Sequence, residues 1–166
     1  MAAPEIRWAE LDGTLLLQLS GDVRQTAFAD MKKSAIFFTF VEGVFSSGTV
    51  RRVLIDVEHV VAMDSTHLGL LARLAVLSQN TLGCPPVLYA PTEKPVKLLR
   101  AMGMTGLFVL CQEPLAMHVE TQALPETGGA ATRDAVLTAH RTLAQLNESN
   151  REQFKTLIDL LESEPD

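Results

Sequence analysis

Short apolar runs broken by turn residues indicate β-structure in the first part of the chain. Residues 6–10 and 14–20 are two such runs, and Asp12 and Gly13 lie between them. An Asp-Gly pair between two apolar runs is typical of a β-hairpin turn. A third run, residues 50–57, is continuous and rich in β-branched side chains, which indicates a strand in the middle of a sheet.

Helical spacing of apolar residues appears between the later strands. We expect helices over residues 25–45 and 65–82, the second ending at Gly83, because glycine readily adopts the left-handed backbone that ends a helix. Two more strands are expected at residues 87–90 and 107–111. A third helix, with Thr92 as its N-cap, is expected between them at residues 93–102. Strands that alternate with helices predict an α/β fold with a mostly parallel sheet and crossover helices.

The helix expected at residues 25–45 is unusually apolar. Four of the seven phenylalanines lie between residues 37 and 45, and apolar side chains cover more than half of the helix circumference. A surface helix needs only one apolar stripe. One interpretation is that another part of the same chain covers the additional face. The other is that this face binds a partner or a second copy.

A helical extension, residues 133–166, is expected after a linker at residues 121–132. Its apolar seam alternates spacings of four and three, which is typical of a coiled coil, at Val136, His140, Leu143, Asn147, Asn150, Phe154, Leu157 and Leu161. We predict one long helix up to about residue 164, with Asn147 and Asn150 as polar residues in its middle. The seam is expected to cover the phenylalanine-rich face, either within one chain or across a dimer.

The most chemically suggestive stretch joins the strand at residues 50–57 to the helix that follows it. Asp64, Ser65 and Thr66 stand at the start of this helix. Asp and Ser are strong N-cap residues, because a side-chain oxygen accepts bonds from the free amides of the first turn. The same amides and the helix dipole favour negative charge, so a hydroxyl here is well placed to carry a phosphate. By itself, however, the triplet is also what an ordinary helix start looks like.

The surroundings of this triplet resemble the STAS domain, the family of bacterial anti-sigma factor antagonists. That family has Asp-Ser-Ser/Thr-Gly-Leu-Gly between a strand and a helix, and the matching residues here are Asp64, Ser65, Thr66, Leu68 and Gly69. His67 stands where the family has glycine. Gly21-Asp22 after the second strand also fits the family pattern. The resemblance covers roughly residues 5 to 115 and leaves the C-terminal extension outside.

The resemblance implies a STAS-like mixed sheet of about four to five strands with flanking helices over residues 1–120, plus the long C-terminal helix. It also implies a regulatory binding protein and not an enzyme. Unmodified, the protein would bind a serine kinase/anti-sigma partner. Phosphorylation of Ser65, with Thr66 as second choice, would end that binding, and a phosphatase would restore it. The residues expected to contact the partner are Asp22, Asp64, Ser65, Thr66, His67 and Leu68.

Two other functions fit parts of the pattern. A constitutive STAS assembly module in a transport or lipid-trafficking complex would use Ser65 only as a helix cap. A hydrolase would combine Ser65 with His59 or His67 and with Asp56 or Asp64. The second is disfavoured, because the chain has no Gly-x-Ser-x-Gly elbow and neighbours in a helix start rarely form a triad.

Composition and residue spacing narrow the classes of ligand that the protein is expected to bind. The formal net charge is −6 without a stripe of Lys and Arg, so we expect no nucleic-acid binding. The four histidines lack metal-ligand spacing, and no phosphate-binding Gly-x-x-x-x-Gly-Lys loop occurs, so we expect neither metal nor cofactor. Cys84 and Cys111 are interpreted as buried thiols, with a disulfide as the less favoured alternative. Without a signal peptide or a membrane-length apolar run, the protein is expected to be cytoplasmic.

Overall fold

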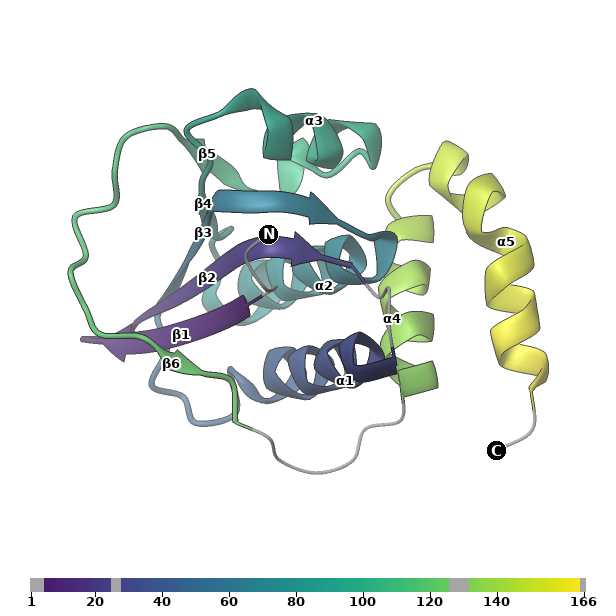
Figure 1. Ribbon diagram of the computed structural model, residues 1–166, viewed down its shortest axis with the longest axis horizontal. Coiled ribbons are helices and arrows are strands. Elements are labelled where there is room, and N and C mark those ends of the chain that lie inside the picture. The colour runs from purple at the N-terminus through teal and green to yellow at the C-terminus, as the bar shows by residue number, and fades with distance from the viewer. Residues whose placement is uncertain (1–4, 25–27, 126–131, 165–166) are drawn as a thin grey trace.

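The computed structural model has one mixed sheet with helices packed against it (Figure 1). It describes residues 5–24, 28–125 and 132–164. In this part of the chain the strand order is β5-β4-β3-β2-β1-β6. The strands are β1 (Glu5–Leu11), β2 (Thr14–Val23), β3 (Arg52–Met63), β4 (Val87–Tyr89), β5 (Val109–Cys111) and β6 (Gln122–Ala123). The α/β class is confirmed, and the sheet has six strands instead of the expected four to five.

The additional strand, β6, lies in what was expected to be linker. It pairs antiparallel with β1, and Arg7 of β1 donates hydrogen bonds to the side chain and backbone of Thr121 just before it. β1 and β2 are antiparallel, whereas β2, β3, β4 and β5 run parallel to one another. Asp12 and Gly13 both have positive φ, 50° and 81°, so the predicted Asp-Gly hairpin turn is confirmed.

Five α-helices complete the described fold, with a 3-10 turn at Thr105–Leu107. They are α1 (Phe28–Gly43), α2 (Ser65–Leu82), α3 (Glu93–Ala101), α4 (Thr132–Ala144) and α5 (Glu148–Ser163). The bounds predicted for α2 are confirmed. Its C-cap Gly83 has φ 74°, the left-handed conformation that made glycine the expected residue there.

The core lies between the sheet and the helices α1 and α2. Alternate residues of β2 and β3 point into it, as the strand periodicity requires, and Leu15, Leu17 and Ile55 are almost completely buried. The central position of β3 agrees with its continuous apolar sequence. Its last residues therefore deliver the start of α2 to a fixed place at the carboxyl edge of the sheet.

The phenylalanine-rich helix α1 is covered from within the chain. Phe37 and Val41 are fully buried, and the Phe40 ring lies 5.6 Å from that of Trp8 on β1. Helix α4 packs against both α1 and α2. The interpretation in which another part of the chain covers this helix is thus confirmed. Residues 25–27 of the predicted helix lie outside the described part of the chain.

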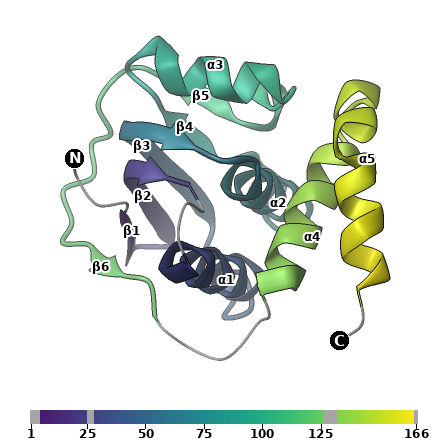
Figure 2. The same cartoon turned by 45° about the vertical axis from the view of Figure 1, so that its right-hand side comes forward.

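The expectation of one long C-terminal helix is wrong, because α4 and α5 form an antiparallel pair (Figures 1 and 2). Asn147, with extended backbone, is the N-cap of α5, and its side-chain oxygen accepts a 2.8 Å bond from the Asn150 amide. The pair is tied at its far end by Arg133, which donates to the Leu161 carbonyl at 2.8 Å. Both views place α4 between α1 and α2 on one side and α5 on the other.

Candidate functional site

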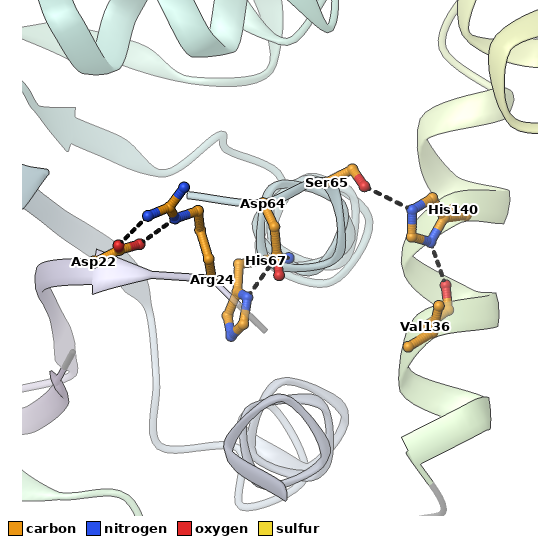
Figure 3. A network of polar contacts seen from close by, with 7 residues as sticks. All are labelled: Asp22, Arg24, Asp64, Ser65, His67, Val136 and His140. Carbon is orange, nitrogen blue, oxygen red and sulfur yellow. Dashed lines mark hydrogen bonds and ion pairs between the residues drawn. The ribbon is translucent and has the colours of Figure 1, made fainter. Parts of the chain in front are cut away.

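Ser65 begins α2 at the carboxyl edge of the sheet, where β2 and β3 end. The Asp64 amide, immediately before it, donates a 3.1 Å bond to the Val23 carbonyl of β2. This bond fixes the turn between β3 and α2 against the neighbouring strand. Figure 3 shows Ser65 and His67 at the start of α2, with Asp22 of β2 and Arg24 just after that strand on one side and His140 from α4 on the other.

Asp64 is the N-cap of α2. Its Oδ1 accepts the His67 amide at 2.9 Å and also contacts His67 Nδ1 at 2.7 Å. Because an ionised carboxylate can only accept hydrogen bonds, Nδ1 carries the proton in this contact. The capping role that the constitutive-module alternative gave to Ser65 is therefore wrong. The Ser65 hydroxyl instead contacts another element.

That contact is a hydrogen bond between Ser65 Oγ and His140 Nε2, 2.8 Å long (Figure 3). The other ring nitrogen of His140, Nδ1, lies 2.7 Å from the Val136 carbonyl and must donate to it. In the neutral imidazole Nε2 is then the acceptor, so Ser65 donates its hydroxyl proton. Burial lowers the pKa of His140, while the Val136 carbonyl and the charge of Asp64 oppose this shift. The neutral form is thus favoured.

Helix α4 holds His140 tightly against α2. The ring is 2% exposed, and the edge of Phe154 from α5 meets it with the ring centres 4.9 Å apart. One turn after Ser65, a Cβ placed on Gly69 would lie 2.3 Å from the Ala139 carbonyl oxygen. Only glycine permits this approach of the two backbones.

The other residues of the motif point inwards. Thr66, His67 and Leu68 are 3%, 2% and 4% exposed, whereas Ser65 is half-buried. His67 stacks on Phe37 of α1 with the ring centres 6.1 Å apart. Direct contact of these three side chains with a partner stays a prediction. In this conformation they are packed in the interior beneath the start of α2. Of the two candidate acceptors, Ser65 is the more accessible.

Asp22 and Arg24 form an ion pair beside this site. Arg24 Nε donates to Asp22 Oδ1 at 2.5 Å, and its Nη2 donates to the other carboxylate oxygen. The hydrogen bond from Arg24 lowers the pKa of Asp22, against partial desolvation and the charge of Asp64, which raise it. The Asp22–Arg24 pair therefore interacts electrostatically with Asp64, on the side of α2 away from the Ser65 hydroxyl (Figure 3).

The histidines expected for a hydrolase do not reach Ser65. His59 is exposed beside Glu58, with 3.6 Å between Nε2 and Oε2, and His67 binds Asp64. The pairing with either histidine that the disfavoured hydrolase alternative would need is therefore not formed. The actual partner, His140, was missed, although one signal was present: a histidine occupies an apolar position of the C-terminal seam and therefore needs a polar partner.

The described residues show neither a metal-binding cluster nor a membrane-spanning helix. These residues contain no group of three His, Cys, Asp or Glu side chains placed to hold a metal ion. None of their helices is long and apolar enough to cross a membrane. Cys84 and Cys111 are free thiols, as expected, but they are half-buried and not buried. No protein-family model matches the chain, and no curated protein matches it in sequence.

Proposed function

We propose that this protein is a phosphorylation-switched regulatory binding protein of the anti-sigma factor antagonist type, with Ser65 as the phosphoacceptor. The single observation that carries the proposal is the position of the Ser65 hydroxyl. It stands at the start of α2, beside the capping Asp64, and bonds to His140 of a separate helix instead of its own. Because this contact joins two separate helices, the hydroxyl can serve as the contact point of an exchangeable partner when α4 is displaced.

The electrostatics support a switch. A phosphate adds close to two negative charges at pH 7. It would join Asp64 and Asp22 at one edge of the sheet, while the amides at the start of α2 help to hold it. A partner that fits the neutral hydroxyl would meet added negative charge and lose binding free energy. The unmodified form is therefore the binding-competent one.

The modification is a phosphoryl transfer from a nucleoside triphosphate bound to the partner kinase. Ser65 Oγ attacks the γ-phosphorus, the bond to the bridging oxygen of the diphosphate breaks, and the hydroxyl proton passes to a base. Hydrolysis by a phosphatase returns the free hydroxyl and inorganic phosphate. The chain itself supplies only the acceptor, and it acts by binding and not as an enzyme. We place this cycle in the cytoplasm, where nucleoside triphosphate is available.

A second candidate is a serine hydrolase, favoured by the 2.8 Å contact between Ser65 and His140. The third member of such a set would be the Val136 carbonyl, a neutral group in the place where a carboxylate normally orients the histidine. A neutral carbonyl stabilises the imidazolium less well. Labelling with a fluorophosphonate probe separates the candidates, because a switch protein should not react at Ser65.

Phosphotransfer from a cell extract tests the proposal. Full-length protein is incubated with extract of its own cells and nucleoside triphosphate labelled at the γ-phosphate, and the label is mapped by mass spectrometry. We expect it on Ser65. Ser65→Ala is the matched control, since Asp64 still caps α2. Label that appears only elsewhere in the chain overturns the assignment.

A further inference from the structure

Helix α4 occupies the surface that carries Ser65. In this structure the hydroxyl is already engaged, by His140. The same helix buries seven of its residues, and two of them, Ala139 and Leu143, belong to the main hydrophobic core. Any protein that binds at Ser65 therefore meets a surface filled by the chain's own C-terminal extension.

We propose that the α4–α5 pair is an intramolecular competitor for the Ser65 surface, and that a phosphate on Ser65 and the docked α4 exclude one another. This inference rests on the proposed function and specifies its regulation. The partner that replaces α4 is one that presents a helix with a small residue opposite Gly69 and a hydrogen-bond acceptor opposite Ser65. Those are the two features that α4 itself supplies through Ala139 and His140.

Space is the first reason for mutual exclusion. Ser65 and Gly69 are one helical turn apart on the same face of α2. At Gly69 the gap to α4 cannot take even a methyl group, because that carbon would lie 2.3 Å from the Ala139 oxygen. At Ser65 the hydroxyl alone already reaches hydrogen-bond distance of His140. A phosphorus with three further oxygens has room there only if α4 moves away.

Hydrogen bonding is the second reason. Nε2 of His140 accepts from Ser65, because Nδ1 donates to the Val136 carbonyl. A phosphoserine has no hydroxyl proton to donate, so two acceptors would face each other. Phe154 of α5 packs against the His140 ring, so an apolar group lies beside the imidazole that the added charge would face. Movement of α4 relieves both conditions.

The two helices of the α4–α5 pair also hold each other, so we expect them to move as a unit. They are tied to each other by Arg133 with the Leu161 carbonyl and by Arg141 with Glu162. Asn150 Nδ2 bonds the Leu143 carbonyl inside the pair and the Met102 carbonyl outside it. The core of β2, β3 and α2 has its own extensive burial. Release of the pair would therefore expose one face of α1 and α2 while the sheet remains folded.

Installing the phosphate directly tests this exclusion. Phosphoserine is incorporated at position 65 of the full-length chain during translation, and hydrogen exchange is followed by mass spectrometry. We expect exchange in residues 132–164 to become faster by about tenfold or more, a typical size for coupling between two sites. Exchange in β2 and β3 should change little. Phosphoserine at the exposed Ser47 is the matched control and should leave α4 protected.

Two results would overturn the inference: unchanged exchange in α4 with phosphoserine at position 65, or slower exchange because His140 becomes protonated and holds the phosphate. A second variant, Ala139→Leu, releases α4 by overpacking against α2 and should speed exchange in residues 132–164 without any phosphate. The experiment distinguishes a failure of this inference from a failure of the proposed function. Release of α4 without phosphorylation in cells would refute the function alone. Phosphorylation in cells without release would refute this inference alone.

Discussion

The carbonyl oxygen of Ala139 stands 2.3 Å from the place where a Cβ on Gly69 would lie. This approach joins α4 to α2 one turn below the Ser65–His140 hydrogen bond. The two contacts together make the start of α2 part of a helix–helix interface.

Gly69→Ala should loosen α4. The added methyl group meets backbone, which cannot move aside as a flexible side chain would, so we expect the free energy of unfolding to fall by about 1 to 3 kcal/mol. Urea denaturation followed by circular dichroism measures this change. Gly43→Ala, at the end of α1, is the matched control, because nothing lies within 4 Å of its added carbon. Equal stability of the two variants would contradict the close packing at Gly69.

His140 should make the stability depend on pH. Burial lowers its pKa in the folded chain below the ordinary 6.5, so the unfolded chain takes up the proton first as pH falls. Its contribution is fully present above about pH 6.5 and is lost as pH falls from there to the folded pKa, at up to about 1.4 kcal/mol per pH unit. Below the folded pKa the contribution is constant.

His140→Gln should remove this part of the slope between pH 7.5 and pH 5, measured as the urea midpoint. His59→Gln serves as the control, because that side chain is exposed, with its Nε2 3.6 Å from Glu58 Oε2. An identical slope for His140→Gln and the parent chain would show that His140 does not titrate with unfolding.

Two substitutions at Asp64 should separate its effect as a helix cap from the effect of its charge. Asp64→Ala removes the oxygen that the His67 amide donates to and should cost about 1 kcal/mol of stability. Asp64→Asn keeps an acceptor oxygen, so its thermal midpoint should move much less. The same variant lacks the charge beside Ser65, and we expect slower phosphorylation in cell extract. An unchanged rate would mean that the charge plays no part in the transfer.

Asn150 should be essential for the turn between α4 and α5. It is 2% exposed, and its side-chain amide donates to the carbonyls of Met102 and Leu143 at 2.8 and 2.9 Å. Asn150→Ala leaves two carbonyls without their donor and should cost about 1 to 3 kcal/mol. Asn150→Asp should cost more, because a carboxylate faces both acceptors. Thermal unfolding ranks the variants, and an Asp variant as stable as the parent would refute this role.

Local patterns were enough to predict the hairpin at Asp12 and Gly13, the bounds of α2 and its end at Gly83, because each depends on neighbouring residues. The break between α4 and α5 was missed, since the heptad spacing continues through it unchanged. Asn147 and Asn150 were seen as interruptions of a seam. Asn147 is the N-cap of α5, and Asn150 is a buried donor whose partners are the carbonyls of residues 102 and 143.

The candidate site divides in the same way. Asp64 and Ser65 were predicted from a short motif. His140, the hydrogen-bond partner of Ser65, lies 75 residues away in the chain. That contact follows from the packing of α4 on α2, which depends on Gly69 and on the small residue Ala139. The residue pattern of one helix cannot show which face of another helix that helix packs against. The polar residue in the apolar seam was the available signal for such a contact.

Whether Ser65 is phosphorylated in its own cells decides between a switch and a constitutive module. The protein is isolated under phosphatase inhibition from several growth conditions, and the occupancy of the peptide that contains Ser65 is quantified by mass spectrometry. We predict a phosphate on Ser65 whose occupancy changes between conditions, with Thr66, which is 3% exposed, unmodified. A Ser65 that carries no phosphate under any condition would contradict the proposed switch.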